Sequence, residues 1–214
     1  MVIEIKNVKK TFKDFVLFKD LNLKIDSGLI TCIYGSSGCG KTTLLDIIGQ
    51  IQGFDSGEVL YDGKAVKGKK EKTKFLREKV GFVFQDYGLI ENETVKQNLQ
   101  LMYCVKKNKE LLKNVSSILK KLNLDESFLN RKIYGMSGGE QQRITIAKIL
   151  LKNPDIILAD EPTASLDEEN KKIVLDFLKE YSKQGKTVII VSHEKDIAEF
   201  SDVCIDLANL KNNK

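Results

Sequence analysis

Tryptophan is absent from the 214 residues, and the chain has only two prolines and one histidine. It also has no internal repeat, low-complexity tract or linker rich in proline and glycine, so we expect one compact unit. Every apolar run ends well short of the roughly 20 residues that cross a bilayer. Glu4 interrupts the segment in which a signal peptide needs an unbroken apolar core, and we therefore expect a cytoplasmic protein.

Metal-binding and nucleic-acid-binding features are scarce as well. The cysteines lie far apart and form no C-x-x-C pair, and only one histidine is present to complete a metal site. The four cysteines are Cys32, Cys39, Cys104 and Cys204. The net charge is only +5, and the densest basic run, residues 64–79, contains two glutamates and no aromatic platform for bases. We therefore expect neither zinc nor nucleic acid as a partner, and we interpret the basic run as a solvated face.

Short apolar runs rich in β-branched residues alternate with longer stretches that have helical spacing. We expect strands at residues 29–34, 80–84, 156–159, 188–191 and 203–207. This alternation predicts an α/β fold with a mostly parallel sheet, in which ligands bind beyond the carboxyl ends of the strands. Residues 2–25 and 57–63 instead predict short antiparallel strands with a turn at Asp62 and Gly63.

A helical insert is predicted between Glu93 and Asn123, where no strand pattern occurs. Apolar residues recur there at helical spacing, with lysines on the other face; they are Leu111, Leu112, Val115, Ile118, Leu119 and Leu122. We interpret this apolar stripe as the core of the insert.

Residues 35–42 fit the pattern G-x-x-x-x-G-K-[ST], after the predicted strand 29–34 and before the helical run 43–50. Glycines let the backbone curl so that amide N–H groups point inward, and the following helix adds the positive end of its dipole. Lys41 is placed to reach the β and γ phosphates of a bound nucleotide, and Thr42 to hold Mg²⁺. The predicted nucleotide-binding residues are Gly35, Ser36, Ser37, Gly38, Cys39, Gly40, Lys41, Thr42 and Thr43.

The predicted strand 156–159 ends in two carboxylates, where a buried strand would ordinarily end in neutral residues. We expect Asp160 to bind Mg²⁺ through water, and Glu161 to align or deprotonate the water that attacks the γ phosphate. His193 follows the predicted strand 188–191 toward the same edge of the sheet. This position favours a contact with the γ phosphate over a structural role.

Residues 134–143 indicate which class of P-loop protein this is. Ser137 and Glu140 have the spacing of a capping box, which predicts a helix over 141–151, but a cap does not explain Gly138 and Gly139. Two glycines beside the cap leave amides open to an approaching phosphate. The segment resembles the signature of ABC ATPases, and this resemblance covers nearly the whole chain, with the motifs in the family's order.

The resemblance implies an ATP hydrolase that pairs head to tail with a second copy around two ATP molecules. Ser137, Gly138 and Gly139 of one copy would close over the ATP of its partner. Phe12 matches the aromatic residue that stacks on adenine, with Val16 beside it. The implied fold is a P-loop NTPase core with an N-terminal antiparallel β subdomain and an α-helical subdomain.

Three further matches come from the same resemblance. Gln85 corresponds to the glutamine that links Mg²⁺ and the attacking water to a transmembrane partner, which makes it a catalytic and metal-contacting candidate. Asp167 lies in the loop that crosses the dimer interface, and His193 corresponds to the switch histidine. One domain over 1–214 is expected, with a core lobe at about 1–86 and 153–214 and the helical subdomain at about 87–152.

The leading hypothesis is an ATP-binding and hydrolysing subunit that powers a separately encoded membrane permease and lies on the inner face of the cell membrane. Residues 140–143 look like the macrolide-export and lipoprotein-release branch, and residues 85–95 are similar to bacteriocin-export ATPases. Exported peptides, bacteriocins or antibiotics are therefore the implied substrates. Glu140, which stands where glutamine is usual, adds a negative charge whose effect on closure is open.

Other functions fit less well. A regulatory ABC ATPase of the cell-division type, coupled to a membrane partner without moving solute, is the alternative that the motifs leave open. A DNA-repair or translation ATPase would need a long coiled coil or a second ATPase unit, and a GTPase would need an N-K-x-D segment. With a membrane partner, the lysines of residues 64–79 would also come near anionic lipid headgroups, as an alternative to a purely solvated face.

Overall fold

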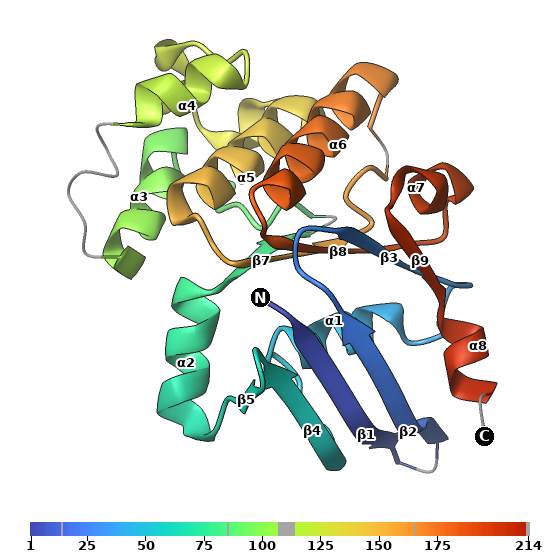
Figure 1. The fold of residues 1–214 in the computed structure, drawn as a ribbon. Helices are drawn as coiled ribbons and strands as arrows, with labels where there is room; N and C mark the ends of the chain where they lie inside the picture. Colours follow the sequence, from blue (N-terminus) through green and yellow to red (C-terminus); the bar gives the residue numbers. More distant parts are fainter. Residues whose placement is uncertain (14, 85, 107–113, 165, 213–214) are drawn as a thin grey trace.

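The computed structural model describes residues 1–13, 15–84, 86–106, 114–164 and 166–212. A parallel sheet crosses the middle of the molecule, with helices above it and an antiparallel sheet below it in the view of Figure 1. Within the described ranges, no helix is both long enough and apolar enough to cross a membrane.

The parallel sheet has the strand order β6-β7-β8-β3-β9. Its strands are β3 (Ile30–Tyr34), β6 (Val80–Val83), β7 (Ile156–Asp160), β8 (Thr187–Ser192) and β9 (Val203–Asp206). Neighbours pair in parallel throughout, and all six residues of β8 are buried. Because such strands are covered on both faces, they appear in the sequence as continuous apolar runs, and the prediction of a mostly parallel sheet is confirmed.

The antiparallel sheet has the order β2-β1-β4-β5 and is formed by β1 (Ile3–Phe12), β2 (Phe15–Ile25), β4 (Ser56–Tyr61) and β5 (Lys64–Ala65). Asp62 and Gly63, between β4 and β5, have φ angles of 48° and 77°. Two residues with positive φ match the turn that the right-handed twist of a hairpin favours. The predicted antiparallel strands and the turn between them are therefore confirmed.

Helix α1 (Lys41–Ile48) packs between the two sheets, with contacts to β7 and β8. Its buried Leu44 and Ile47 belong to an apolar cluster that also includes Ile5 of β1. This packing fixes the helix N-terminus at the carboxyl end of β3.

The other helices are α2 (Gly68–Glu78), α3 (Val95–Lys106), α4 (Val115–Lys121), α5 (Gly138–Lys152), α6 (Glu168–Lys183), α7 (Lys195–Phe200) and α8 (Leu207–Asn212). Short 3₁₀ turns, η2 (Glu126–Asn130) and η3 (Ile133–Gly135), lie between α4 and α5. Figure 1 shows α5 and α6 over the parallel sheet and α3 and α4 beyond them. Val115, Leu119 and Leu122 of the predicted stripe are buried, whereas Leu111 and Leu112 lie outside the described residues.

Asp155 ties together the starts of three strands of the parallel sheet. Its carboxylate lies 2.7 Å from Lys79 Nζ and 3.0 Å from Lys186 Nζ. Burial opposes ionisation, but the hydrogen bonds and charges of these two lysines outweigh it and lower the pKa of Asp155. This pairing lies at the amino ends of β6, β7 and β8, on the edge of the sheet opposite the predicted ligand site.

Candidate functional site

A cleft of about 980 Å³ lies beyond the carboxyl ends of β3, β7 and β8, and this volume is at the upper end of typical small-molecule sites. It is lined by Tyr34, Gly35, Ser36, Ser37, Gly38, Gly40, Lys41, Thr42, Thr43, Asp160, Glu161, Ala164 and His193. The structure thus brings together residues that the sequence placed after three separate strands.

The loop between β3 and α1 has a backbone that only glycine accommodates at one key position. Gly40 has a φ of 102°, and a Cβ added there would lie 2.8 Å from Leu17 Cδ1. Helix α1 begins at the next residue without a side-chain cap and without an acidic residue in its first turn. Its N-terminal amides and the positive end of its dipole therefore face the cleft, which suits an anionic ligand.

Lys41 folds back over this loop. Its side chain is only 8% exposed, and Nζ donates to the carbonyl oxygens of Gly35 at 2.8 Å and Ser36 at 3.0 Å. Cys39 contributes its backbone N–H, 3.3 Å from the carbonyl oxygen of Ser36, while its side chain packs against the apolar cluster around α1 and does not line the cleft. Hydrogen bonds to its own carbonyl groups therefore hold the loop in shape.

The two carboxylates at the end of β7 experience different surroundings. Burial, supplemented by the charge of Glu161, raises the pKa of Asp160, whereas a hydrogen bond from Thr42 and the charge of Lys41 act in the opposite direction. Burial also raises the pKa of Asp46, to which the charge of Asp160 contributes. Asp160 and Glu161 both line the cleft, so a cation bound there would relieve the repulsion between their charges.

The donor set at this point fits Mg²⁺, which prefers oxygen ligands and retains several waters. Thr42 offers a hydroxyl and Asp160 a carboxylate, and both residues line the cleft. Gln85, the third predicted metal contact, lies outside the described residues.

Glu161 is held more tightly than its neighbour. Its backbone has a φ of 45°, a left-handed conformation that costs a non-glycine residue on the order of 1 to 3 kcal/mol. Its carboxylate accepts a hydrogen bond from Ser192 Oγ at 3.0 Å and lies 2.7 Å from His193 Nδ1. The Glu161 side chain is 15% exposed and that of His193 is 63% exposed. A fixed carboxylate therefore sits behind a histidine at the cleft opening.

Ser192 is a functional residue that the sequence analysis missed. Besides donating to Glu161, its hydroxyl accepts the N–H of Glu194 at 3.1 Å, so it orders both the carboxylate and the backbone around His193. Lys171, near the start of α6, forms ion pairs with the same segment. Its Nζ lies 3.2 Å from Glu194 Oε2 and also pairs with the carboxylate of Asp196. The only sequence signal for Ser192 was its position immediately before His193.

The predicted capping box at the start of α5 is confirmed. Ser137 Oγ accepts the N–H of Glu140 at 3.3 Å, and Glu140 Oε2 accepts the N–H of Ser137 at 2.7 Å. Burial opposes ionisation of Glu140, but hydrogen bonds from Ser137 and the charge of Arg131 outweigh it and lower its pKa. The negative charge of Glu140, which stands where the signature usually has glutamine, is therefore paired with the Ser137 N–H and with Arg131 of the same chain.

Gly138 and Gly139 lie in the first turn of α5, packed too closely for a larger residue. A Cβ at Gly138 would lie 2.8 Å from Tyr87 Oη, and one at Gly139 would lie 2.3 Å from Asn170 Nδ2. The Asn170 amide also donates to Asp167 at 2.8 Å, and its oxygen accepts from Arg143 at 2.9 Å. The signature glycines are thus joined to Asp167, the N-cap residue of α6.

Several predicted nucleotide contacts do not line the cleft of their own chain. Ser137, Gly138, Gly139 and Asp167 lie at the starts of α5 and α6, outside the lining. Phe12 and Val16 flank the turn between β1 and β2, where they are 42% and 48% exposed. Lys10 Nζ lies 4.8 Å from the centre of the Phe12 ring. Within one chain, the structure therefore brings together only part of the predicted site.

Comparison with known proteins identifies the family. The sequence profile described as "ABC transporter" matches residues 18–164. The chain belongs to the ABC transporter family. Consistent with the loop, carboxylates and histidine of the cleft, this ABC protein is an ATP-binding ATP hydrolase of a transporter.

Curated relatives extend over nearly the whole chain. The uncharacterized ABC transporter ATP-binding protein MJ0796 of Methanocaldococcus jannaschii is 39% identical over 96% of this chain and 93% of its own length. The lipoprotein-releasing system ATP-binding protein LolD of Aquifex aeolicus is 34% identical over 98% of this chain and 95% of its own length. The macrolide export ATP-binding/permease protein MacB of Campylobacter jejuni is 38% identical over 92% of this chain, which spans only 31% of MacB.

Solved structures confirm the ABC ATPase fold. The dimeric structure of MJ0796 matches with a TM-score of 0.84 and 37% identity, covering 96% of this chain and 94% of the other. A second dimeric structure of MJ0796, in a post-hydrolysis state bound to ADP and Pi, also matches with a TM-score of 0.84, at 36% identity and with the same coverage of both chains.

Proposed function

We propose that this ABC protein is the ATP-hydrolysing subunit of an exporter, working as a head-to-tail homodimer around two ATP molecules and driving a separately encoded membrane permease. The observation that carries the proposal is the separation of two phosphate-binding features in one chain. The cleft around Lys41 is one of them, and the amides of Gly138 and Gly139, which the capping box does not engage, are the other, outside that cleft. A second copy would bring the two together, and the dimeric structures of MJ0796 support this arrangement.

In the proposed mechanism, the amides of the loop and Lys41 bind the β and γ phosphates. Glu161 accepts a proton from water as the water oxygen bonds to the γ phosphorus, and the bond to the β-phosphate oxygen breaks with its electron pair leaving on ADP. Ser192 fixes the carboxylate, and His193 contacts the γ phosphate at the cleft opening. Bound Mg²⁺, with Thr42 and Asp160 holding it, would supply charge neutralisation to the triphosphate.

The mechanism places the two copies on opposite sides of each ATP. Ser137, Gly138 and Gly139 would approach the γ phosphate from the partner, and Asp167 would cross between the copies. Asn170 bonds to Asp167 and packs against Gly139, so the two interface elements would move as one unit. Phe12, with Val16 beside it, would stack on adenine, because the Phe12 residue is 42% exposed and an aromatic ring offers a flat apolar surface to a base.

A groove beside the parallel sheet supports the coupling to a permease. It is lined by residues of β6, α3 and α5 and by the segment after β6, namely Gly81, Phe82, Phe84, Tyr87, Gly88, Met102, Thr145, Lys148, Ile149 and Lys152. The rings of Phe82 and Phe84 stack with centres 5.1 Å apart, and Phe84 is 38% exposed. Thr145 Oγ1 donates to the carbonyl oxygen of Tyr87 at 2.9 Å, which ties the groove to the signature helix.

We also propose a direction of transport and a class of cargo. MacB is named for macrolide export and LolD for lipoprotein release, and both align with most of this chain. We extend this to exported peptides, bacteriocins or antibiotics, and we place the protein at the inner face of the membrane, held there by its permease. The bacteriocin assignment rests on the sequence similarity of residues 85–95.

A pull-down identifies the partner. Glu161→Gln should trap the ATP-bound state, so tagged Glu161→Gln isolated from membranes with Mg-ATP should carry a multi-span permease, and Lys41→Ala, which lacks the phosphate contact, should not. Recovery of no membrane protein with Glu161→Gln contradicts the coupling. Recovery of a membrane protein that moves no solute when reconstituted favours the regulatory type of ABC ATPase instead.

A further inference from the structure

Helix α2 and its flanking residues hold all of the protein's net positive charge. Residues 64–79 contain eight lysine and arginine residues and two glutamates, a net charge of +6, whereas the full chain has a net charge of +5. The rest of the chain therefore has a net charge of −1. A nearly neutral protein with one concentrated basic element presents a directional surface for a polyanion.

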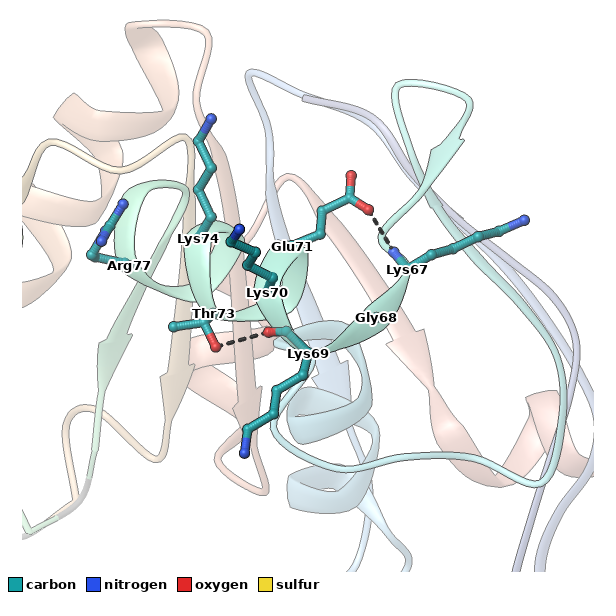
Figure 2. A pocket seen from close by; sticks show the side chains of 8 residues that line it. All are labelled: Lys67, Gly68, Lys69, Lys70, Glu71, Thr73, Lys74 and Arg77. Carbon is teal, nitrogen blue, oxygen red and sulfur yellow. Dashed lines mark hydrogen bonds between the residues drawn. The ribbon is translucent and has the colours of Figure 1, made fainter.

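The cationic side chains of α2 lie on its exposed side. Lys67, Lys69, Lys70, Lys74 and Arg77 are exposed and, with Gly68, Glu71 and Thr73, line a shallow hollow on the surface. In Figure 2 the amino groups of Lys67, Lys69 and Lys74 extend in different directions from the helix. Because they do not converge on one point, they suit an extended anionic surface better than a single small anion.

Both carboxylates of the segment are engaged locally. Glu71 Oε2 accepts the backbone N–H of Lys67 at 2.9 Å, and Glu78 Oε1 pairs with Arg77 at 2.7 Å. Lys69, Lys70 and Lys74 make no ion pair with any residue that the structure describes. Their charges therefore remain available to an outside partner.

Packing fixes which way this charge faces. Phe75, on the inner side of α2, is 7% exposed, and its ring centre lies 4.3 Å from that of Tyr61. Lys152 Nζ donates to the carbonyl oxygen of Leu76 at 2.8 Å, and Lys152 also lines the groove proposed to receive the permease. The basic face is thus held rigidly next to the surface expected to meet a membrane protein.

We infer that α2 docks on the anionic lipid headgroups of the membrane that contains the permease, an inference that rests on the proposed function. Lysine predominates over arginine in the segment, and a mobile point charge suits scattered headgroups, whereas the planar fork of arginine suits a fixed carboxylate. The only well-buried apolar side chain of α2 is Phe75, which packs inward, so the contact is electrostatic and involves no insertion into the bilayer.

Vesicle co-sedimentation of the purified full chain tests this inference. The protein should bind vesicles of phosphatidylcholine with about a third phosphatidylglycerol, but not phosphatidylcholine alone, and 0.5 M salt should release it. Each cation near an anionic leaflet strengthens binding by roughly fivefold, so K67Q/K69Q/K70Q/K74Q should bind roughly several hundredfold more weakly. The matched control, K120Q/K121Q/K172Q/K183Q, loses the same charge from exposed lysines of α4 and α6 and should stay within a few fold of wild type.

Three results would overturn the lipid assignment. The first is an equal loss of vesicle binding in both quadruple variants, and the second is equal binding of wild type to neutral and anionic vesicles. The third is that wild type binds polyglutamate beads as tightly as anionic vesicles and that the α2 variant weakens both equally. The last result would indicate an acidic protein partner. ATP hydrolysis is measured on the same samples. Full turnover without vesicle binding refutes only the lipid inference, whereas a wild-type protein without Mg-ATP turnover refutes the proposed function.

Discussion

Replacing Ser192 by alanine tests whether the position of Glu161 is set from the neighbouring strand. The Ser192 hydroxyl donates to Glu161 Oε2 at 3.0 Å, and a hydrogen bond to a charged group is worth about 1.5 to 3 kcal/mol. If that energy holds the carboxylate in its reactive position, its loss lowers kcat by roughly 10- to 100-fold, at about 1.4 kcal/mol per factor of ten. The KM for ATP should change little, because Ser192 does not line the cleft.

The assay is steady-state phosphate release at saturating Mg-ATP, with thermal unfolding measured on the same preparations. Ser201→Ala is the matched control, because its hydroxyl donates to the carbonyl oxygen of Ile197 at 2.8 Å, outside the cleft. That variant should keep the kcat of wild type. A folded Ser192→Ala protein with kcat within twofold of wild type, or with its defect confined to KM, would refute the positioning argument.

Three further predictions address stability, the loop and the signature. Asp155→Asn should lower the free energy of unfolding by about 1 kcal/mol at pH 7. Because folding lowers the pKa of Asp155, this difference from wild type is present above about pH 4 and disappears as pH falls through the folded pKa. Urea unfolding of both proteins at pH 7 and pH 3 measures it. A thiol-blocking reagent should inhibit ATP hydrolysis through the half-buried Cys39, because bulk added at its Sγ beside Gly35 would distort the loop from outside the cleft. Bound Mg-ATP should protect by holding the loop in shape, and an equally sensitive Cys39→Ala protein would locate the effect elsewhere. Gly139→Ala should displace the Asn170 side chain and abolish ATP-driven pairing, measured by size-exclusion chromatography, and unchanged pairing would contradict the packing seen at Gly139.

The elements that local pattern specifies were predictable from the sequence. The buried strands β3, β7 and β8 appear as continuous apolar runs. The predicted bounds of β6 and of the more exposed edge strand β9 differ from the observed ones by one residue. Helix α5 begins at Gly138, earlier than the predicted residue 141, because the cap at Ser137 satisfies the N–H of Glu140 and offsets the low helix propensity of the two glycines.

What could not be predicted depends on contacts between distant segments. Ser192 and Glu161 are 31 residues apart, and no local spacing relates them. The left-handed backbone of Glu161 also has no sequence signal, because glutamate rarely adopts it and tertiary packing imposes it. Similarly, Asn170 appears in the sequence as an ordinary residue of a helix start, and only the fold places it against Gly139.

The proposed mechanism requires that ATP is held between Lys41 of one copy and the glycine amides after Ser137 of another. The most direct measurement is the sedimentation mass of purified Glu161→Gln with and without Mg-ATP. We predict one chain without nucleotide and two chains with Mg-ATP, with two nucleotides retained per dimer. A protein that binds Mg-ATP in its cleft and yet stays a single chain at every concentration of Mg-ATP would contradict the account.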